Sequence, residues 1–274
     1  MLVTAPSHQR AQGRAELTLE AAPGGARLRH LYQSAPLRIL FPDSDPDEPS
    51  TGALVNVAGG LAGGDRVDTR LVLRPHARFT ATSASAEKIY RSLGAETEIS
   101  CAITVEDNAC CEWLPQETIL FDDARLARRL DIDLAPRARL LAAEMLVFGR
   151  AARGERFRHG MVRDRWRLRR AGRLAWAETL RLEDPPDGVL NDRFAMGGAG
   201  AMATLLLAVP DALQHRAVAR DAANGAASLL APDLLLARWL GEAGAVRAGL
   251  GAAIMRLRAA AFGHPARLPR LWRT

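Results

Sequence analysis

Three stretches of the chain share one pattern: LVLRPHARFTA (71–81), ITVEDNACCEW (103–113) and IDLAPRARLLA (132–142). Each begins with three alternating residues, turns at a proline or an Asp-Asn pair, and continues through an alanine into a second strand-like run. The offsets are 103 − 71 = 32 and 132 − 103 = 29 residues. Strand–turn–strand units that recur at this spacing are typical of stacked coils whose neighbours bury each other's apolar faces. A fourth copy is LRRAGRLAWAE (168–178), which has a tighter Ala-Gly turn.

These repeats predict a mainly β fold that is β-helix-like, with stacked or mixed sheets and a few helices near the C-terminus. An ordinary β-sandwich of regular hairpins would give similar spacing, so the pattern favours stacking without excluding the sandwich. We expect a single domain over residues 1–274, strand-rich from 14 to 210 and helix-containing from 211 to 274.

Four segments outside the repeats have their own composition. The proline- and acid-rich FPDSDPDEPSTG (41–52) predicts an exposed loop. Residues 212–240 and 247–262 are rich in Ala and Leu, and we expect them to be helical. AMATLLLAVP (201–210) fits a strand and a buried helix equally well, because a short apolar run has no periodicity that separates the two.

Two glycine pairs lie in LVNVAGGLAGGDRVD (54–68), between two strand-like runs. Gly59 and Gly64 have the spacing of a phosphate-binding P-loop, but that motif continues with Lys and then Ser or Thr. Here an aspartate and an arginine follow, and the segment leads into a strand, so no helix N-terminus is available to hold an anion. We therefore predict a structural turn formed by Gly59, Gly60, Gly63, Gly64 and Asp65.

The chain is basic, with a net charge of +6 and an isoelectric point of about 10.1. Its arginines are spread along the whole sequence without a nucleic-acid-binding motif, so a surface that attracts an acidic protein is the simpler interpretation. Of the 37 basic residues, only Lys88 is a lysine. Because an ammonium differs chemically from a guanidinium, Lys88 is a candidate site residue, although biased codon usage would leave the same trace.

The cellular compartment is indicated by three features of the sequence. No apolar run is long enough to cross a bilayer, and the N-terminus lacks the basic start and apolar core of a signal peptide. The three cysteines are an odd number, and two of them are adjacent, which argues against a disulfide framework. We expect a cytoplasmic protein that binds no membrane.

Motifs for catalysis are weak. The six histidines are scattered, and neither a GxSxG elbow nor an HExxH pair is present. Cys101, Cys110 and Cys111 lie in strand patterns, where a small buried thiol is the common outcome, and they lack the CxxC spacing of a zinc site. A cysteine-dependent hydrolase stays open as an alternative, because catalytic partners meet only in the fold. We predict that the chain is not an enzyme and holds no cofactor tightly.

Carboxylates give a stronger signal. Glu144 and Glu178 align when the third and fourth repeats are superposed, at an offset of 178 − 144 = 34, so stacked coils would point both into a common interior. A buried carboxylate needs an arginine partner, water or a cation, and carboxylates without imidazole or thiolate hold a divalent metal loosely. We predict weak metal-transit sites at Glu144 and Glu178, with Glu87, Lys88 and Glu117 as further candidates.

Several blocks of the sequence together resemble one known family. They are, in order, LVNVAGGLAGGDRVD, TSASAEKIYRS, EWLPQETILFDDARL, AAEMLVFGRAARGE, AETLRL and the terminal LPRLWRT. The chain resembles the UreD family of urease accessory proteins (UreH in some bacteria) from about Arg14 to Thr274. The resemblance is weaker in the loop at 41–52 and in the Ala/Leu-rich part from about 210 to 262.

This resemblance implies a non-enzymatic scaffold for urease maturation with a β-helix-like fold. Members of the family bind UreF and, through it, the GTPase UreG, and they dock on apo-urease in a higher-order hetero-oligomer. An internal water-filled tunnel for transient Ni²⁺ would give Glu144 and Glu178 a role as weak stopping points. The alternative is a basic nucleic-acid-binding protein, which salt-sensitive retention on DNA without association with UreF would indicate.

Overall fold

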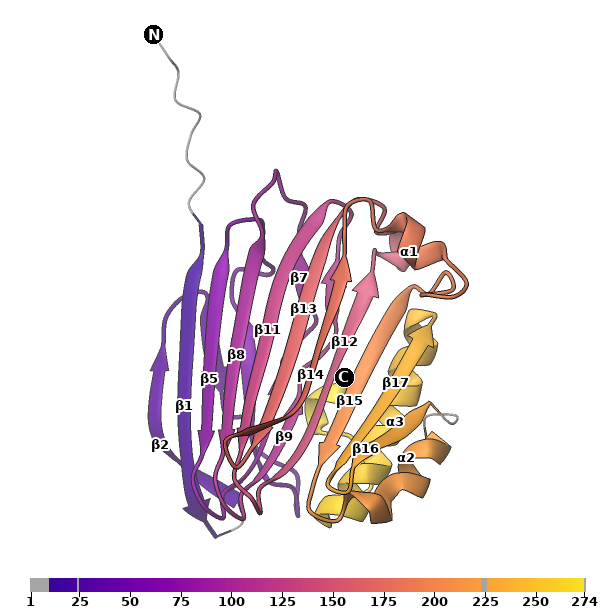
Figure 1. The fold of residues 1–274 in the computed structure, drawn as a ribbon. Coiled ribbons are helices and arrows are strands. Elements are labelled where there is room, and N and C mark those ends of the chain that lie inside the picture. Colours follow the sequence, from indigo (N-terminus) through magenta and orange to yellow (C-terminus); the bar gives the residue numbers. More distant parts are fainter. Residues whose placement is uncertain (1–9, 24, 223–225, 274) are drawn as a thin grey trace.

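The computed structural model describes residues 10–23, 25–222 and 226–273, in which two β-sheets face each other and helices cover one end (Figure 1). From β4 to β13 the chain passes back and forth between the two sheets and winds through about four turns of a β-solenoid. One apolar core lies between the sheets, and a second lies between the ten-stranded sheet and the C-terminal helices. The prediction of a mainly β fold of stacked coils is confirmed.

The seven-stranded sheet has the order β14-β13-β11-β8-β5-β1-β2. Its strands are β1 (Gln12–Ala22), β2 (Gly25–Gln33), β5 (Arg66–Leu73), β8 (Thr97–Val105), β11 (Ala124–Leu134), β13 (Gly160–Arg170) and β14 (Arg173–Leu182). The central five of these, β13, β11, β8, β5 and β1, are parallel to one another, while β2 and β14 close the two ends antiparallel.

The ten-stranded sheet has the order β16-β17-β15-β12-β9-β6-β4-β3, with β10 and β7 added in turn beside β12. Its strands are β3 (Leu37–Leu40), β4 (Ser50–Asn56), β6 (Arg78–Ser83), β7 (Glu87–Ile89), β9 (Cys110–Leu114), β10 (Thr118–Leu120), β12 (Arg139–Phe148), β15 (Ala201–Ala208), β16 (Ala227–Ala231) and β17 (Leu234–Gly241).

The helices of the described residues are mostly short. They are the α-helices α1 (Asp187–Asn191), α2 (Arg216–Ala222) and α3 (Ala243–Phe262) and the 3₁₀ turns η1 (Ala151–Arg153), η2 (Ala212–His215) and η3 (Arg270–Trp272). In Figure 1, α2 and α3 cover the strands at the C-terminal end. No helix in these ranges is long and apolar enough to span a membrane.

The two helical predictions for the C-terminal part have different outcomes. Residues 247–262 do lie in α3, as expected. The prediction for 212–240 is wrong from Ala227 onward, where β16 and β17 lie, and its residues 223–225 are outside the described residues. The ambiguous run at 201–210 contains β15, all of whose residues are buried. One face of β15 meets the opposite sheet and the other lies under α3, so β15 reads as a continuous apolar run and not as an alternating strand.

The first three sequence repeats each cross from the seven-stranded to the ten-stranded sheet, as β5–β6, β8–β9 and β11–β12. The alanine of each repeat (Ala77, Ala109 and Ala138) is fully buried at this corner. Backbone hydrogen bonds join successive corners: the N–H of Cys110 donates to the carbonyl of Ala77 at 2.8 Å, and that of Arg139 donates to Ala109 at 2.9 Å. The small side chain therefore lets neighbouring coils stack closely.

The fourth repeat does not cross. Ala171 and Gly172 have φ of 49° and 77°, so they form a two-residue turn of the kind that joins antiparallel strands. The chain consequently returns as β14 beside β13, within the seven-stranded sheet. Glu178 lies in that sheet and Glu144 in the other, so the predicted equivalence of the two repeats is wrong.

The segment at 41–52 is a loop only as far as Pro49, and it is only partly exposed. The Glu48 side chain is 7 % exposed and accepts hydrogen bonds from Arg258 and Arg267 of the C-terminal part. The prediction of an exposed loop over 41–52 is therefore wrong at Glu48, where partners far along the sequence bind it, and at 50–52, which begin β4.

Candidate functional site

A cavity of about 160 Å³ lies between the two sheets. Its walls come from the inward faces of both: Val67, Ile99, Cys101 and Arg128 from the seven-stranded sheet, and Leu54, Trp113 and Glu144 from the ten-stranded sheet. Further polar side chains line it from β4, β7, the end of β6 and the segments after β6 and β9: Asn56, Ser83, Ser85, Glu87, Lys88 and Gln116. The cavity lining is therefore polar around Glu144 and Arg128 and around Glu87 and Lys88, and apolar where Val67, Ile99 and Leu54 form it.

Glu144 lies on the wall of this cavity and is 6 % exposed. Trp113 Nε1 donates to its Oε1 at 3.0 Å. Its Oε2 forms an ion pair with Arg128, 3.1 Å from Nη2, but this buried oxygen accepts no hydrogen bond. A buried carboxylate oxygen left in this state is able to accept a proton or to contact a cation.

Arg128 is shared between two acids. Its Nε and Nη2 donate to Oδ1 and Oδ2 of Asp164 at 2.9 and 2.6 Å, while Nη1 donates to Thr118 at 3.2 Å. The three buried groups Glu144, Arg128 and Asp164 thus carry one positive and two negative formal charges. Burial raises the pKa of Glu144, Arg128 opposes this, and Asp164 adds to the rise. With both acids ionised, the three groups have a formal charge of −1, which one further positive charge would neutralise.

Glu87 and Lys88 lie in β7 beside the same cavity. Asn56 Nδ2 donates to both carboxylate oxygens of Glu87, at 3.0 and 3.3 Å. Burial raises the pKa of Glu87, although the hydrogen bond from Asn56 counteracts it. Lys88 has an exposed side chain and forms no ion pair with any described residue. The structure thus brings three of the candidate residues, Glu87, Lys88 and Glu144, to one cavity.

The other two candidates lie outside the cavity lining. Glu117 forms an ion pair with Arg247 of α3, on the helix-covered side of the ten-stranded sheet. Glu178 in β14 forms an ion pair with Arg238 of β17, a contact that joins the two sheets. Arg238 is connected to Glu144 by register: Glu144 is opposite Thr204 in β15, and Thr204 is opposite Arg238. One inward-facing row of the ten-stranded sheet therefore runs from Glu144 to the Glu178 ion pair.

The glycine stretch forms a turn. The carboxylate of Asp65 accepts hydrogen bonds from the backbone N–H groups of Ala11, at 2.8 Å, and Ala62, at 2.7 Å. Gly64 has φ of +92°, and a Cβ on Gly63 would lie 2.0 Å from Oγ of Ser92. Because these N–H groups already donate to Asp65, they are not available to bind a phosphate. A structural turn therefore remains our interpretation of Gly59, Gly60, Gly63, Gly64 and Asp65.

All three cysteines are free and buried. Burial raises the pKa of Cys110 to about 12 and raises those of Cys101 and Cys111 well above their usual value. A neutral thiol is a poor nucleophile and a poor metal ligand. Within the described ranges, no group of three or more His, Cys, Asp or Glu side chains is placed to hold a metal ion.

Sequence reasoning missed Arg128 and Asp164. Both stand in arginine-rich runs, RLARRLDIDL and RDRWRLRR, that resemble solvated strand faces. The available signal was strand alternation, since Asp164 shares its parity with the apolar Val162, Trp166 and Leu168 and therefore points inward.

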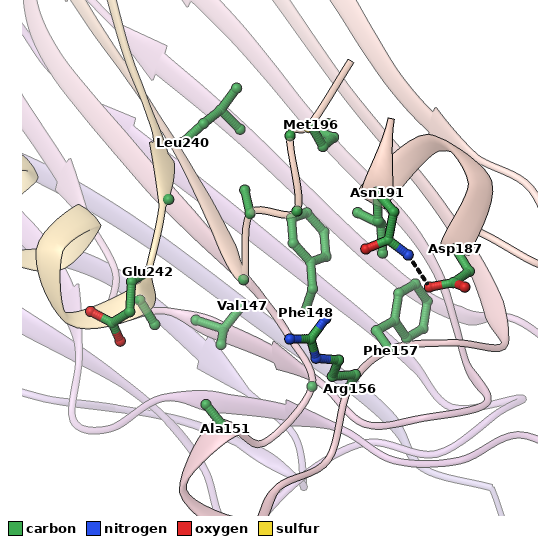
Figure 2. A pocket seen from close by; sticks show the side chains of 18 of the residues that line it. Val147, Phe148, Ala151, Arg156, Phe157, Asp187, Asn191, Met196, Leu240 and Glu242 are labelled. Atoms are coloured by element: carbon green, nitrogen blue, oxygen red, sulfur yellow. Dashed lines mark hydrogen bonds between the residues drawn. The ribbon is translucent and has the colours of Figure 1, made fainter. Parts of the chain in front are cut away.

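A larger cavity of about 660 Å³ lies where β12 ends and α3 begins (Figure 2). Figure 2 shows Phe148, Phe157 and Met196 on its walls, with Asn191 bonded to Asp187 at 2.6 Å. Glu242 also lines it, but its carboxylate caps α3 by accepting from the N–H of Ala245 at 3.0 Å. Its acidic groups are thus engaged locally, and the smaller cavity between the sheets is the better candidate for a polar ligand.

Comparison with known proteins gives a consistent result. The sequence model of the family described as UreD urease accessory protein matches residues 11–273. A urease accessory protein UreD of Granulibacter bethesdensis is 49% identical over 238 residues, covering 85% of this chain and 99% of that protein. A UreD of Magnetococcus marinus is 43% identical over 274 residues, with coverage of 96% and 94%. A third, from Rhodopseudomonas palustris, is 43% identical over 273 residues, with coverage of 96% and 92%.

Proposed function

Because the chain belongs to the UreD family, non-catalytic accessory proteins that act in urease maturation, we propose that it conducts nickel through the cavity between its sheets to apo-urease. In this proposal the partners in the cytoplasmic maturation complex are UreF, the GTPase UreG held through UreF, and urease itself. Nickel is the cargo and is bound only in passing.

The Oε2 of Glu144, which forms an ion pair with Arg128 but accepts no hydrogen bond, is the observation that carries this proposal. It lies in a cluster whose formal charge is one positive charge short, on the wall of a polar cavity. A divalent cation would find one carboxylate there, with the arginine and the indole as the other close neighbours, and so few oxygen ligands give weak binding. Weak binding suits transfer, because a tightly held ion would not move on.

The proposed path of nickel is given by the order of the polar residues along the cavity and the sheet. Glu87 and Asn56 border the cavity at β7 and β4, and Glu144 is the next carboxylate on its wall. From Glu144 the row through Thr204 leads to Arg238 and Glu178 at the edge of the sheets. We propose that Glu87 and Glu144 are successive stopping points and that Glu178 marks the end of the row.

The test combines Glu144→Ala with Glu178→Ala in cells that carry urease and the other accessory proteins. We expect the double variant to co-purify with UreF as wild type does, while the urease produced contains less nickel and is less active. Each single variant shows which carboxylate matters more. Glu98→Ala is the matched control, since Glu98 points outward from β8 and pairs with Arg66 at the surface.

Normal urease nickel content with the double variant would end the transit route and leave the scaffold role untouched. A clean deletion separates the two: it should leave urease expressed but poor in nickel. Active, nickel-loaded urease in a deletion strain without a second copy would contradict the maturation role itself.

A further inference from the structure

Four arginines form a column on the outer face of the seven-stranded sheet. Arg163, Arg165, Arg167 and Arg169 occupy alternate positions of β13, while Asp164, Trp166 and Leu168 between them are buried. Successive members of such a column are about 6.6–6.8 Å apart along the strand. Like charges at this spacing repel one another along the strand.

Most of this column lacks acidic partners. Arg163 forms an ion pair with Glu96 at 2.8 Å. Arg165, Arg167 and Arg169 form no ion pair with any described residue, and the buried Nε of Arg165 has no hydrogen-bond partner. In contrast, Arg14, Arg66 and Arg74, on or just after strands of the same sheet, each pair with a glutamate. From here on, the name arginine column is used only for the three members without an ion pair, Arg165, Arg167 and Arg169.

The two neighbouring strands, β11 and β14, place different kinds of residue on either side of the arginine column. On one side, β11 places Arg129 opposite Arg165, Asp131 opposite Arg167 and Asp133 opposite Arg169. On the other side, β14 places the small neutral residues Thr179 and Ala177 opposite Arg165 and Arg167, and no further strand follows β14 in the described residues. Two of the three arginines therefore have an aspartate on the β11 side, and the column has only β14, the end strand of the sheet, on its other side.

We propose that the arginine column binds an extended acidic segment of a partner protein, with a carboxylate at every second residue. An extended chain repeats its side chains on one face at the same spacing as β13, so successive carboxylates would meet successive guanidinium groups. The aspartates of β11 fix which way the segment lies, because a carboxylate placed over them is repelled. This surface is on the opposite side of the sheet from the cavity and does not depend on nickel transit.

A nucleic acid fits this face less well. A phosphate backbone carries a charge at every nucleotide and would meet Asp131 and Asp133 as well as the arginines. The tryptophans of these strands, Trp166 and Trp176, pack into the core and offer no platform for stacking bases. A protein segment can place its carboxylates over one stripe only, so the observations favour a protein.

The experiment measures binding of two fluorescent decapeptides to the full chain by anisotropy. One alternates Glu with Ser, and the other has the same composition with all glutamates in one block. We expect the alternating peptide to bind about threefold or more tighter than the block peptide. Arg165→Gln, Arg167→Gln and Arg169→Gln combined should weaken its binding by about tenfold. The control combines Arg14→Gln, Arg66→Gln and Arg74→Gln, which removes the same charge and should change affinity by less than about twofold.

A second variant does not depend on how the first one folds. Asp133 is exposed and forms no ion pair with a described residue, so Asp133→Asn should tighten binding of the alternating peptide by about twofold. The proposal is overturned if the two peptides bind equally, if both triple variants lose the same affinity, or if Asp133→Asn changes nothing. It is also overturned if a ten-nucleotide oligothymidylate binds more tightly than the peptide and loses this binding in the column variant.

Discussion

Arg258 in α3 and Glu112 in β9 form an ion pair that is buried completely, with both residues 0 % exposed. Nε and Nη2 of the guanidinium donate to Oε1 and Oε2 of the carboxylate at 2.7 and 3.1 Å. Arg258 also binds Glu48 of the 41–49 loop, and Nδ1 of His264 lies 3.0 Å from Glu112 Oε1. One guanidinium thus joins the C-terminal helix, the ten-stranded sheet and the loop.

Arg258→Met should lower the free energy of unfolding by about 3–5 kcal/mol, because two buried carboxylates lose their shared cation. Urea unfolding at pH 7 measures this. Arg256→Met is the control, since its partner Asp221 is exposed and the change should stay within about 0.5 kcal/mol. Similar small losses in both variants would show that the buried pair contributes little.

Glu112 should make the fold sensitive to acid. Burial alone would raise its pKa, but the hydrogen bond with His264 and the charge of Arg258 lower it from 4.5 to about 2. A carboxyl whose folded pKa lies below its unfolded pKa stabilises the fold above the unfolded value and loses this contribution as the pH falls. The contribution is about 3 kcal/mol and disappears between about pH 5 and pH 2.

The measurement compares the unfolding free energies of wild type and Glu112→Gln at several pH values across that window. The wild-type curve should fall more steeply than that of the variant, which has lost this titration. Parallel curves would mean that Glu112 has the same pKa in the folded and unfolded states.

Local patterns were enough to predict the coils but not the charge networks that join them. The alternation around Ala77, Ala109 and Ala138 depends only on neighbouring residues, so it is visible in the sequence. Arg258 and Glu112 are 146 residues apart, and Arg128 meets Asp164 only after two coils have stacked in register. Which of many arginines faces which acid is decided by that stacking. The hairpin at Gly172 was misread for a related reason, because one short turn decides which sheet the next strand joins.

Gly63→Ala should destabilise the fold by about 1–3 kcal/mol through overpacking. The added Cβ would meet Oγ of Ser92 at 2.0 Å and the carbonyl oxygen of Ala95 at 2.5 Å, neither of which is the end of a long flexible side chain. Gly188→Ala in α1 is the control, because a Cβ added there would have no atom within 4 Å. Thermal unfolding should show a lower midpoint for the first variant only. Equal midpoints would mean that the turn has room to adjust.

The cysteines should be unreactive while the chain is folded. The pKa of Cys110 near 12, compared with its usual 9.0, lowers its thiolate fraction at neutral pH by about a thousandfold. Iodoacetamide at pH 8 should therefore modify Cys101, Cys110 and Cys111 slowly in the native chain and rapidly in urea, as mass spectrometry can follow. Rapid labelling of one cysteine in the native chain would contradict this prediction and favour the alternative of a cysteine-dependent hydrolase.

Glu144→Gln should stabilise the fold while impairing urease activation. Burial raises the pKa of Glu144, so its ionised form is less favourable in the folded chain than in the unfolded one. Such a group lowers stability as the pH rises from its unfolded to its folded pKa, and the cost is fully present above the folded pKa. A glutamine keeps an oxygen for Trp113 and leaves Arg128 with Asp164 as a neutral pair, so unfolding at pH 7 should require about 0.5–2 kcal/mol more.

Glu98→Gln, at an exposed surface pair, serves as the control for this prediction and should stay within about 0.5 kcal/mol of wild type. A carboxylate that lowers stability is retained where its charge has a use, and the use proposed here is a brief contact with a passing cation. A Glu144→Gln chain that is less stable than wild type would show that the carboxylate serves the fold. Its role in transit would then lose its physical basis.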